Sequence, residues 1–195
     1  MGCTRSRGSR GFQCLASSPR PGEPGRYVAQ GAFNMSEKSS SRKRQRWTTG
    51  AVMKIPLGNG EHAYGQMLES PEYAFFGVRT REELSLDAVL DHAVIFRLWV
   101  MQSAHVESRW TKIGNAELNE TLKSPVLRFN QDPLNPQDIR LTYDGCAGEI
   151  GTLEDCRNIE CAAVWDPEHV EDRLRSHFEG VPCKWSLSLR PTNAT

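Results

Sequence analysis

Residues 52–68 read VMKIPLGNGEHAYGQML, and this stretch decides how the folded part of the chain begins. An apolar run ends at Pro56, a tight turn sequence follows, and a second run starts after Gly60. The Asn59-Gly60 pair favours a type I′ turn, because both residues tolerate the positive φ angles that this turn requires. The stretch therefore predicts a β-hairpin that opens a domain.

The charge of the 195-residue chain is divided unevenly behind a net value of +0. Residues 1–46 carry 10 Lys and Arg against 2 Asp and Glu, a net of +8, whereas residues 47–195 carry 14 against 22, a net of −8. The first segment is rich in Gly, Ser, Pro and Arg without helical or strand periodicity, so we predict a disordered basic extension. Met35 begins MSEKSSSRKRQRW, a favourable translation start, and we interpret residues 1–34 as an upstream extension.

Hydropathy and cysteine spacing indicate the compartment. No stretch approaches the roughly 20 apolar residues of a membrane helix, and the N-terminus lacks the apolar core of a secretory signal. We therefore expect a cytoplasmic protein that does not bind membranes. The six cysteines contain no Cys-x-x-Cys spacing, so free thiols are expected rather than a disulfide framework.

Residues 47–195 predict a single α+β domain, with a twisted, mostly antiparallel sheet, the opening β-hairpin and about two helices. The expected strands are 72–79, a central strand at 93–101, and short strands at 109–114, 126–130, 139–144 and 183–189. Helices are expected within 81–92 and 166–180. In the second helix Asp166 can cap the start, Pro167 suits the first helical position, and Gly180 ends it.

Catalytic sequence motifs are missing, but five residues are candidates for a site. No nucleophile elbow, phosphate-binding loop, dinucleotide fingerprint or His-Glu-x-x-His motif occurs. On a strand, His105 and Glu107 would share one face and could share a metal ion or a proton; the alternative is an exposed polar turn. Asp144 and Cys146 lie in the loop YDGCAGE and could reach a pocket; the alternative is an ordinary Asp-Gly turn. Arg97 interrupts an apolar strand; its charge needs a substrate oxygen or a neighbouring carboxylate, unless its charged end extends to the edge of the sheet.

Four segments carry a resemblance to a known family. WTTGAVMKIPLGNGEHAYGQML (47–68), VIFRLWV (94–100), RWTKIG (109–114) and QDPLNPQDIRLTYDG (131–145) resemble segments of the immunity protein 26 family, and the resemblance extends over residues 47–189. Most members of that family are taken as immunity proteins, which neutralise a toxin of a neighbouring or sister bacterial cell. One branch is named for a small phosphotriesterase (HocA-type), and the chain resembles this branch more closely.

The closer resemblance implies a hydrolase that acts on a small-molecule phosphotriester, that is, organophosphate hydrolysis. Such a reaction needs an activated nucleophile, a polarised phosphoryl oxygen and an apolar pocket. His105 with Glu107, or Asp144 with Cys146, are the candidates for activation, and Arg97 is the candidate for polarisation. The sequence leaves the cofactor open; a divalent metal ion is one that this chemistry can use.

The alternative function is an immunity protein that binds and neutralises a bacterial toxin without catalysis. A net charge of −8 over residues 47–195 suits the basic cleft of a toxin, because complementary charge speeds association. The basic segment SRKRQRW could contact nucleic acid, but the acidic body behind it would repel a polyanion, so nucleic acid is not expected as a partner.

Overall fold

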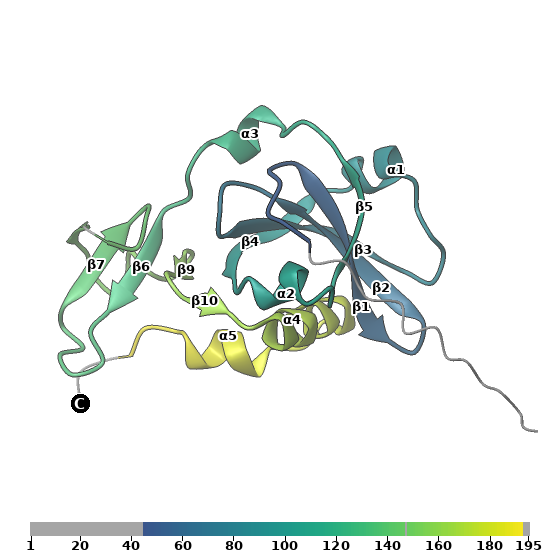
Figure 1. The fold of residues 1–195 in the computed structure, drawn as a ribbon. Helices are drawn as coiled ribbons and strands as arrows, with labels where there is room; N and C mark the ends of the chain where they lie inside the picture. The colour runs from purple at the N-terminus through teal and green to yellow at the C-terminus, as the bar shows by residue number, and fades with distance from the viewer. Residues whose placement is uncertain (1–44, 147, 193–195) are drawn as a thin grey trace, which may run out of the picture. The chain divides into compact units, whose positions relative to one another are not determined.

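The computed structural model describes residues 45–146 and 148–192, and the chain begins there with the hairpin (Figure 1). Strand β1 (Ala51–Gly58) pairs antiparallel with β2 (Glu61–Met67). The two-residue turn between them has φ angles of 53° at Asn59 and 76° at Gly60, as the Asn-Gly sequence predicts. The predicted basic extension, residues 1–46, lies outside the described residues except for its last two, and its state stays a prediction.

Six strands form the larger sheet, in the order β10-β4-β3-β2-β1-β5. Its further members are β3 (Glu72–Thr80), β4 (Val94–Val100), β5 (Thr111–Asn115) and β10 (Val164–Trp165). All neighbours are antiparallel except β10 and β4, which run parallel. Both strands of the hairpin are therefore interior strands of the sheet, with β3 beside β2 and the edge strand β5 beside β1.

Both faces of this sheet are covered, so successive residues of a strand can both be apolar, one on each face. On one face Met53 and Ile55 pack in the main core with Leu174 of helix α4 (Pro167–Glu179). On the other face Val52 packs with Val89 of the short helix α1 (Leu86–Leu90). A strand buried on both sides loses the polar alternation of a half-exposed strand.

Helix α4 begins and ends as its sequence predicts. The Asp166 side chain accepts a hydrogen bond from the Glu168 amide at 3.2 Å, and Pro167 is the first helical residue. Gly180 ends the helix in the left-handed conformation with φ 68°. The shorter helix α5 (Lys184–Ser188) follows and is joined to α4 by a hydrogen bond from the Trp185 ring to Asp172, at 2.9 Å.

A second sheet has four strands in the order β8-β7-β6-β9. They are β6 (Arg128–Gln131), β7 (Ile139–Thr142), β8 (Glu149–Ile150) and β9 (Glu160–Cys161), and β6 and β9 run parallel. Phe129, Ile139 and Cys156 form a separate small core beneath it. The second sheet thus has its own packing instead of extending the first.

A buried ion-pair cluster joins the two sheets. Arg128 of β6 is only 1% exposed and donates to Glu72 of β3 at 2.6 Å. Arg97 of β4 donates to both oxygens of the same carboxylate, at 3.2 and 2.6 Å. The Arg128 guanidinium also lies 4.8 Å from the Trp99 ring centroid. The anionic partner of Arg97 is therefore a neighbouring carboxylate, one of the alternatives left open by the sequence.

The predicted single sheet with two helices is wrong, although α+β describes the chain broadly. The described residues form two mixed sheets with five helices and are mostly β. Most of the strand predicted at 183–189 is instead helix α5 (Lys184–Ser188), and His105 lies in helix α2 (Ser103–Val106). The remaining helix, α3 (Glu120–Lys123), and the two-residue strands β8 to β10 are too short to show a periodic pattern. No helix among the described residues is long and apolar enough to cross a membrane, and a cytoplasmic location stays a prediction.

Candidate partner-binding surface

His105 and Glu107, expected on one face of a strand, are placed differently by helix α2. His105 is 2% exposed, and its Nδ1 lies 3.2 Å from the Tyr73 hydroxyl, with the Trp47 ring packed edge-on 5.4 Å away. Burial lowers the pKa of the imidazole. Glu107 caps the end of α2 and is exposed. The imidazole thus belongs to an aromatic cluster in the core.

Arg97 and Asp144 border the same hollow, of about 400 Å³, but each has polar partners already. Arg97 is committed to Glu72 and also donates to the Ser124 carbonyl at 3.0 Å. Asp144 accepts from the Cys146 amide and the Thr142 hydroxyl, both at 2.9 Å, and these bonds lower the pKa of its carboxyl. Asp144 therefore shapes its own turn.

Cys146 is exposed, and the four described cysteines are free thiols. His105 and Glu107 do not border the hollow that Arg97 and Asp144 share. Residues 45–146 and 148–192 hold no group of three or more His, Cys, Asp or Glu side chains that could bind a metal ion. Within the described residues, the five candidates are thus spread over separate places.

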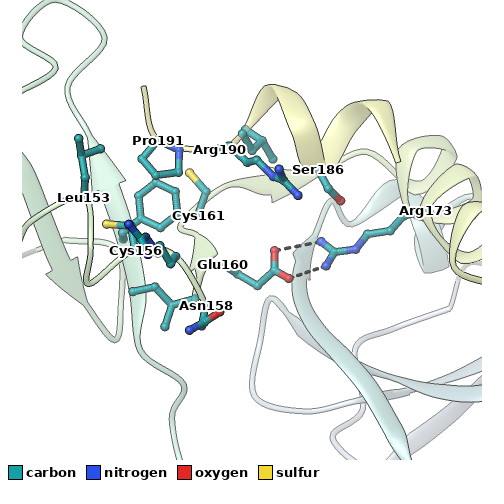
Figure 2. Close-up of a pocket in the computed structure, with 13 residues that line it drawn as sticks. Leu153, Cys156, Asn158, Glu160, Cys161, Arg173, Ser186, Arg190 and Pro191 are labelled. Carbon is teal, nitrogen blue, oxygen red and sulfur yellow. Dashed lines mark hydrogen bonds and ion pairs between the residues drawn. The ribbon is translucent and has the colours of Figure 1, made fainter. Parts of the chain in front are cut away.

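The hollow in Figure 2, of about 740 Å³, lies between β9, α4 and α5. Two charged residues in its lining form an ion pair with each other. Arg173 of α4 binds both oxygens of Glu160, and its guanidinium lies 4.4 Å from the Phe96 ring centroid. Cys156 and Cys161 lie at the opposite end of the view, and burial raises the pKa of both thiols. Such thiols stay protonated and are poor nucleophiles. The two cysteines of this hollow therefore fit a role in packing better than a role in catalysis.

A third hollow, of about 670 Å³, lies between helices α1 and α3, and we call it the α1–α3 hollow. Gln66 and Phe76 of the large sheet line it together with Leu90, residues 92–94 and residues 117–122. Each short helix has a side-chain cap, Ser85 for α1 and Asn119 for α3. The two short helices on either side of the hollow therefore each have a side-chain cap at the N-terminal end.

Negative charge surrounds the α1–α3 hollow. Segments 82–94 and 115–123 carry six carboxylates and one lysine, and one of these carboxylates, Glu83, pairs with Lys54 of β1. Lys123 lies 2.6 Å from Glu120 and 3.6 Å from Glu117, and the bond to Glu120 raises its pKa. Asp87 and Asp91 are exposed and form no ion pair with any described residue. The surface keeps an excess of carboxylates for an external cation.

Residues 48–140 match the family model described as Immunity protein 26.

This Imm26-matched region is just under half of the chain and holds β1 to β6, α1 to α3 and the start of β7. It contains every residue that lines the α1–α3 hollow, whereas the hollow in Figure 2 is lined, apart from Phe129, by residues beyond 140. No curated protein and no solved structure matches the chain. The α1–α3 hollow thus lies wholly within the matched region, as do two smaller hollows of about 360 and 280 Å³.

The match corrects the expected activity. It supports the immunity protein 26 part of the resemblance, over residues 48–140 instead of 47–189, and gives no support to the small phosphotriesterase branch. The prediction of a phosphotriesterase-type enzyme is therefore wrong, and the phosphotriester substrate has no support. The comparisons do not bear on His105, Glu107, Asp144, Cys146 and Arg97, whose roles stay predictions. Sequence reasoning predicted the helix within 81–92 but assigned no function to it, to α3 or to Gln66, because single polar residues in apolar runs carry no motif.

Proposed function

We propose that the protein is an immunity protein, which binds a bacterial toxin and blocks it without catalysis. The match of residues 48–140 to the immunity protein 26 family carries this proposal. Immunity requires a surface complementary to the toxin and no reacting group. The commitment of Arg97 and Asp144 to structural partners is compatible with such a role.

Charge indicates what kind of toxin the surface fits. Residues 47–195 have a net charge of −8, and the uncommitted carboxylates around α1 add local negative potential. A negative surface attracts a basic cleft, raises the association rate and disfavours acidic partners. We therefore propose a basic toxin as the partner, with binding that weakens as salt is added.

The test is a protection assay in bacteria. Each gene that flanks the gene of this protein is induced alone and together with the full 195-residue chain, and growth is followed. Arrest by one flanking product, and recovery when the chain is co-expressed, supports the proposal. The purified toxin should also co-elute with the chain in size-exclusion chromatography. If a flanking product arrests growth equally with and without the chain, or if none is toxic, the proposal is refuted.

A further inference from the structure

We propose that the α1–α3 hollow holds a lysine or arginine side chain of the toxin. This inference rests on the proposed immunity function and adds the place and the chemistry of recognition. Three features of the hollow support it: an unused hydrogen-bond acceptor at its base, apolar walls, and a negative rim.

The acceptor is the amide oxygen of Gln66, a residue that is only 1% exposed. Its Nε2 donates to the Gly50 carbonyl at 3.2 Å and to the Ala116 carbonyl at 3.1 Å, so both amide hydrogens are used and the orientation of the amide is fixed. Oε1 accepts no hydrogen bond from any residue that the structure describes. No buried side-chain oxygen or nitrogen of the described residues lacks a partner, so this oxygen is accessible to solvent, and because Gln66 lines the hollow, an occupant with N–H groups can bind it there.

The walls suit the aliphatic stem of a basic side chain. Phe76 of β3 and Leu90 of α1 line one part, Leu118 and Leu122 line another, and Val94 of β4 is 37% exposed at the opening. Lysine and arginine bury their methylene groups along apolar surface while the charged end seeks polar atoms. An apolar side chain would fill the walls but would leave Gln66 Oε1 without a donor.

The rim selects charge. Glu117 and Glu120 line the hollow and share a single lysine, while Asp91 stands at the end of α1 without an ion pair to any described residue. An acidic side chain would be repelled there. A guanidinium or ammonium group would gain charge-assisted contacts in a partly desolvated place, where such contacts are stronger than in water.

The first experiment uses a small probe, so it does not depend on a toxin. The ¹⁵N-labelled full chain is titrated with n-butylguanidinium, an arginine side-chain analogue, and with neutral n-butylurea as the matched control. We expect saturable shifts at the Gln66 side-chain amide and at the backbone amides of Val94 and Leu118, and only with the cation. Equal shifts with both probes, or shifts spread evenly over all exposed carboxylates, would overturn the inference.

Variants then separate the hollow from general charge. Val94→Arg places a guanidinium on the wall of the hollow and should weaken butylguanidinium binding by about tenfold or more, the loss of one charge-assisted hydrogen bond. Val164→Arg, on an exposed valine of the same sheet outside the hollow, should leave it unchanged. Asp91→Lys should weaken binding and Glu149→Lys, with the same change in charge, should not. Equal effects within either pair contradict the inference.

The same variants in the protection assay distinguish the two proposals. If the unmodified chain protects cells and Val94→Arg abolishes protection while Val164→Arg keeps it, the hollow is the toxin site. If both arginine variants protect as well as the unmodified chain, the hollow is not the site, although the immunity function stands. If the unmodified chain fails to protect, the immunity function is refuted, whatever the probe titration shows.

Discussion

Removing the charge of Glu72 should destabilise the protein more than any other single charge change that we can identify. This carboxylate accepts hydrogen bonds from Arg128 and Arg97, and Arg128 is 1% exposed. In Glu72→Gln, Arg128 would keep the Arg97 carbonyl, to which its two NH groups donate at 3.3 Å, and at most a neutral amide oxygen in place of the carboxylate. Removing one partner of a buried ion pair leaves an uncompensated charge and costs about 3–5 kcal/mol.

That cost is a large share of the roughly 5–15 kcal/mol by which domains are stable. Urea unfolding followed by tryptophan fluorescence measures it, since Trp99 lies beside Arg128. The matched control is Glu61→Gln, whose ion pairs with Arg79 and Arg81 span 3.9 and 3.7 Å near the surface and are worth about 0–1 kcal/mol.

A double variant tests the reason for the cost. If Glu72→Gln destabilises by stranding the Arg128 charge, then Glu72→Gln with Arg128→Met should cost clearly less than the two single changes added together. The reasoning is refuted if Glu72→Gln lowers the free energy of unfolding no more than Glu61→Gln does, or if the two changes are additive.

Three further predictions concern single positions. Burial lowers the pKa of His105, so the unfolded chain takes up the proton at a higher pH than the folded chain does. The free energy of unfolding should therefore be unaffected by this group above about pH 6.5 and should fall, by up to about 1.4 kcal/mol per pH unit, as the pH drops toward the folded-state pKa. Urea midpoints at several pH values measure this, and His105→Phe should remove the dependence. Gly145→Ala should cost about 1–3 kcal/mol, because φ is +81° and the new Cβ would lie 2.8 Å from the Trp99 ring, whereas Gly180→Ala, at φ +68° with open space around it, should cost about 1 kcal/mol; equal losses in chemical denaturation would argue against the contact. Asp166→Ala should cost about 1 kcal/mol through loss of the cap on α4, and Asp166→Asn should restore most of it in thermal unfolding.

Local signals in the sequence predicted the elements that depend on a few neighbouring residues. Asn59-Gly60 predicted the hairpin turn, because positive φ angles are restricted to few residue types. Asp166, Pro167 and Gly180 predicted both ends of helix α4 for similarly local reasons. In each case the determining contacts lie within one turn of the chain.

Elements that depend on distant partners were not predictable in the same way. Residues 183–189 alternate apolar and polar side chains and so resemble a strand, yet Trp185 and Leu189, four residues apart, pack against the main core as a helical pair. The two-residue strands β9 and β10 exist because β6 and β4 offer edges to pair with, which no local pattern records. The division into two sheets has the same origin.

The candidate residues show what residue chemistry alone leaves open, whereas the expected hydrolase activity came from the family resemblance. His105, Arg97 and Asp144 were singled out because their side chains can catalyse, but catalytic ability does not tell whether a hydrogen-bonding partner is already present. In the fold each of the three is engaged, by Tyr73, Glu72 and the turn at Cys146 respectively.

A binding site is instead recognised by what is left unused. The α1–α3 hollow is assembled from segments around residues 66, 90 and 120, and its distinguishing atoms are an amide oxygen without a donor among the described residues and two carboxylates that share one lysine. Whether a polar atom is used or unused is a property of the folded chain, since it depends on Gly50 and Ala116 occupying the other side of the Gln66 amide. If Val94→Arg, which fills the hollow, abolishes protection and Val164→Arg does not, the functional surface will be the one with unused polar atoms. The residues chosen for their catalytic side chains did not indicate that surface.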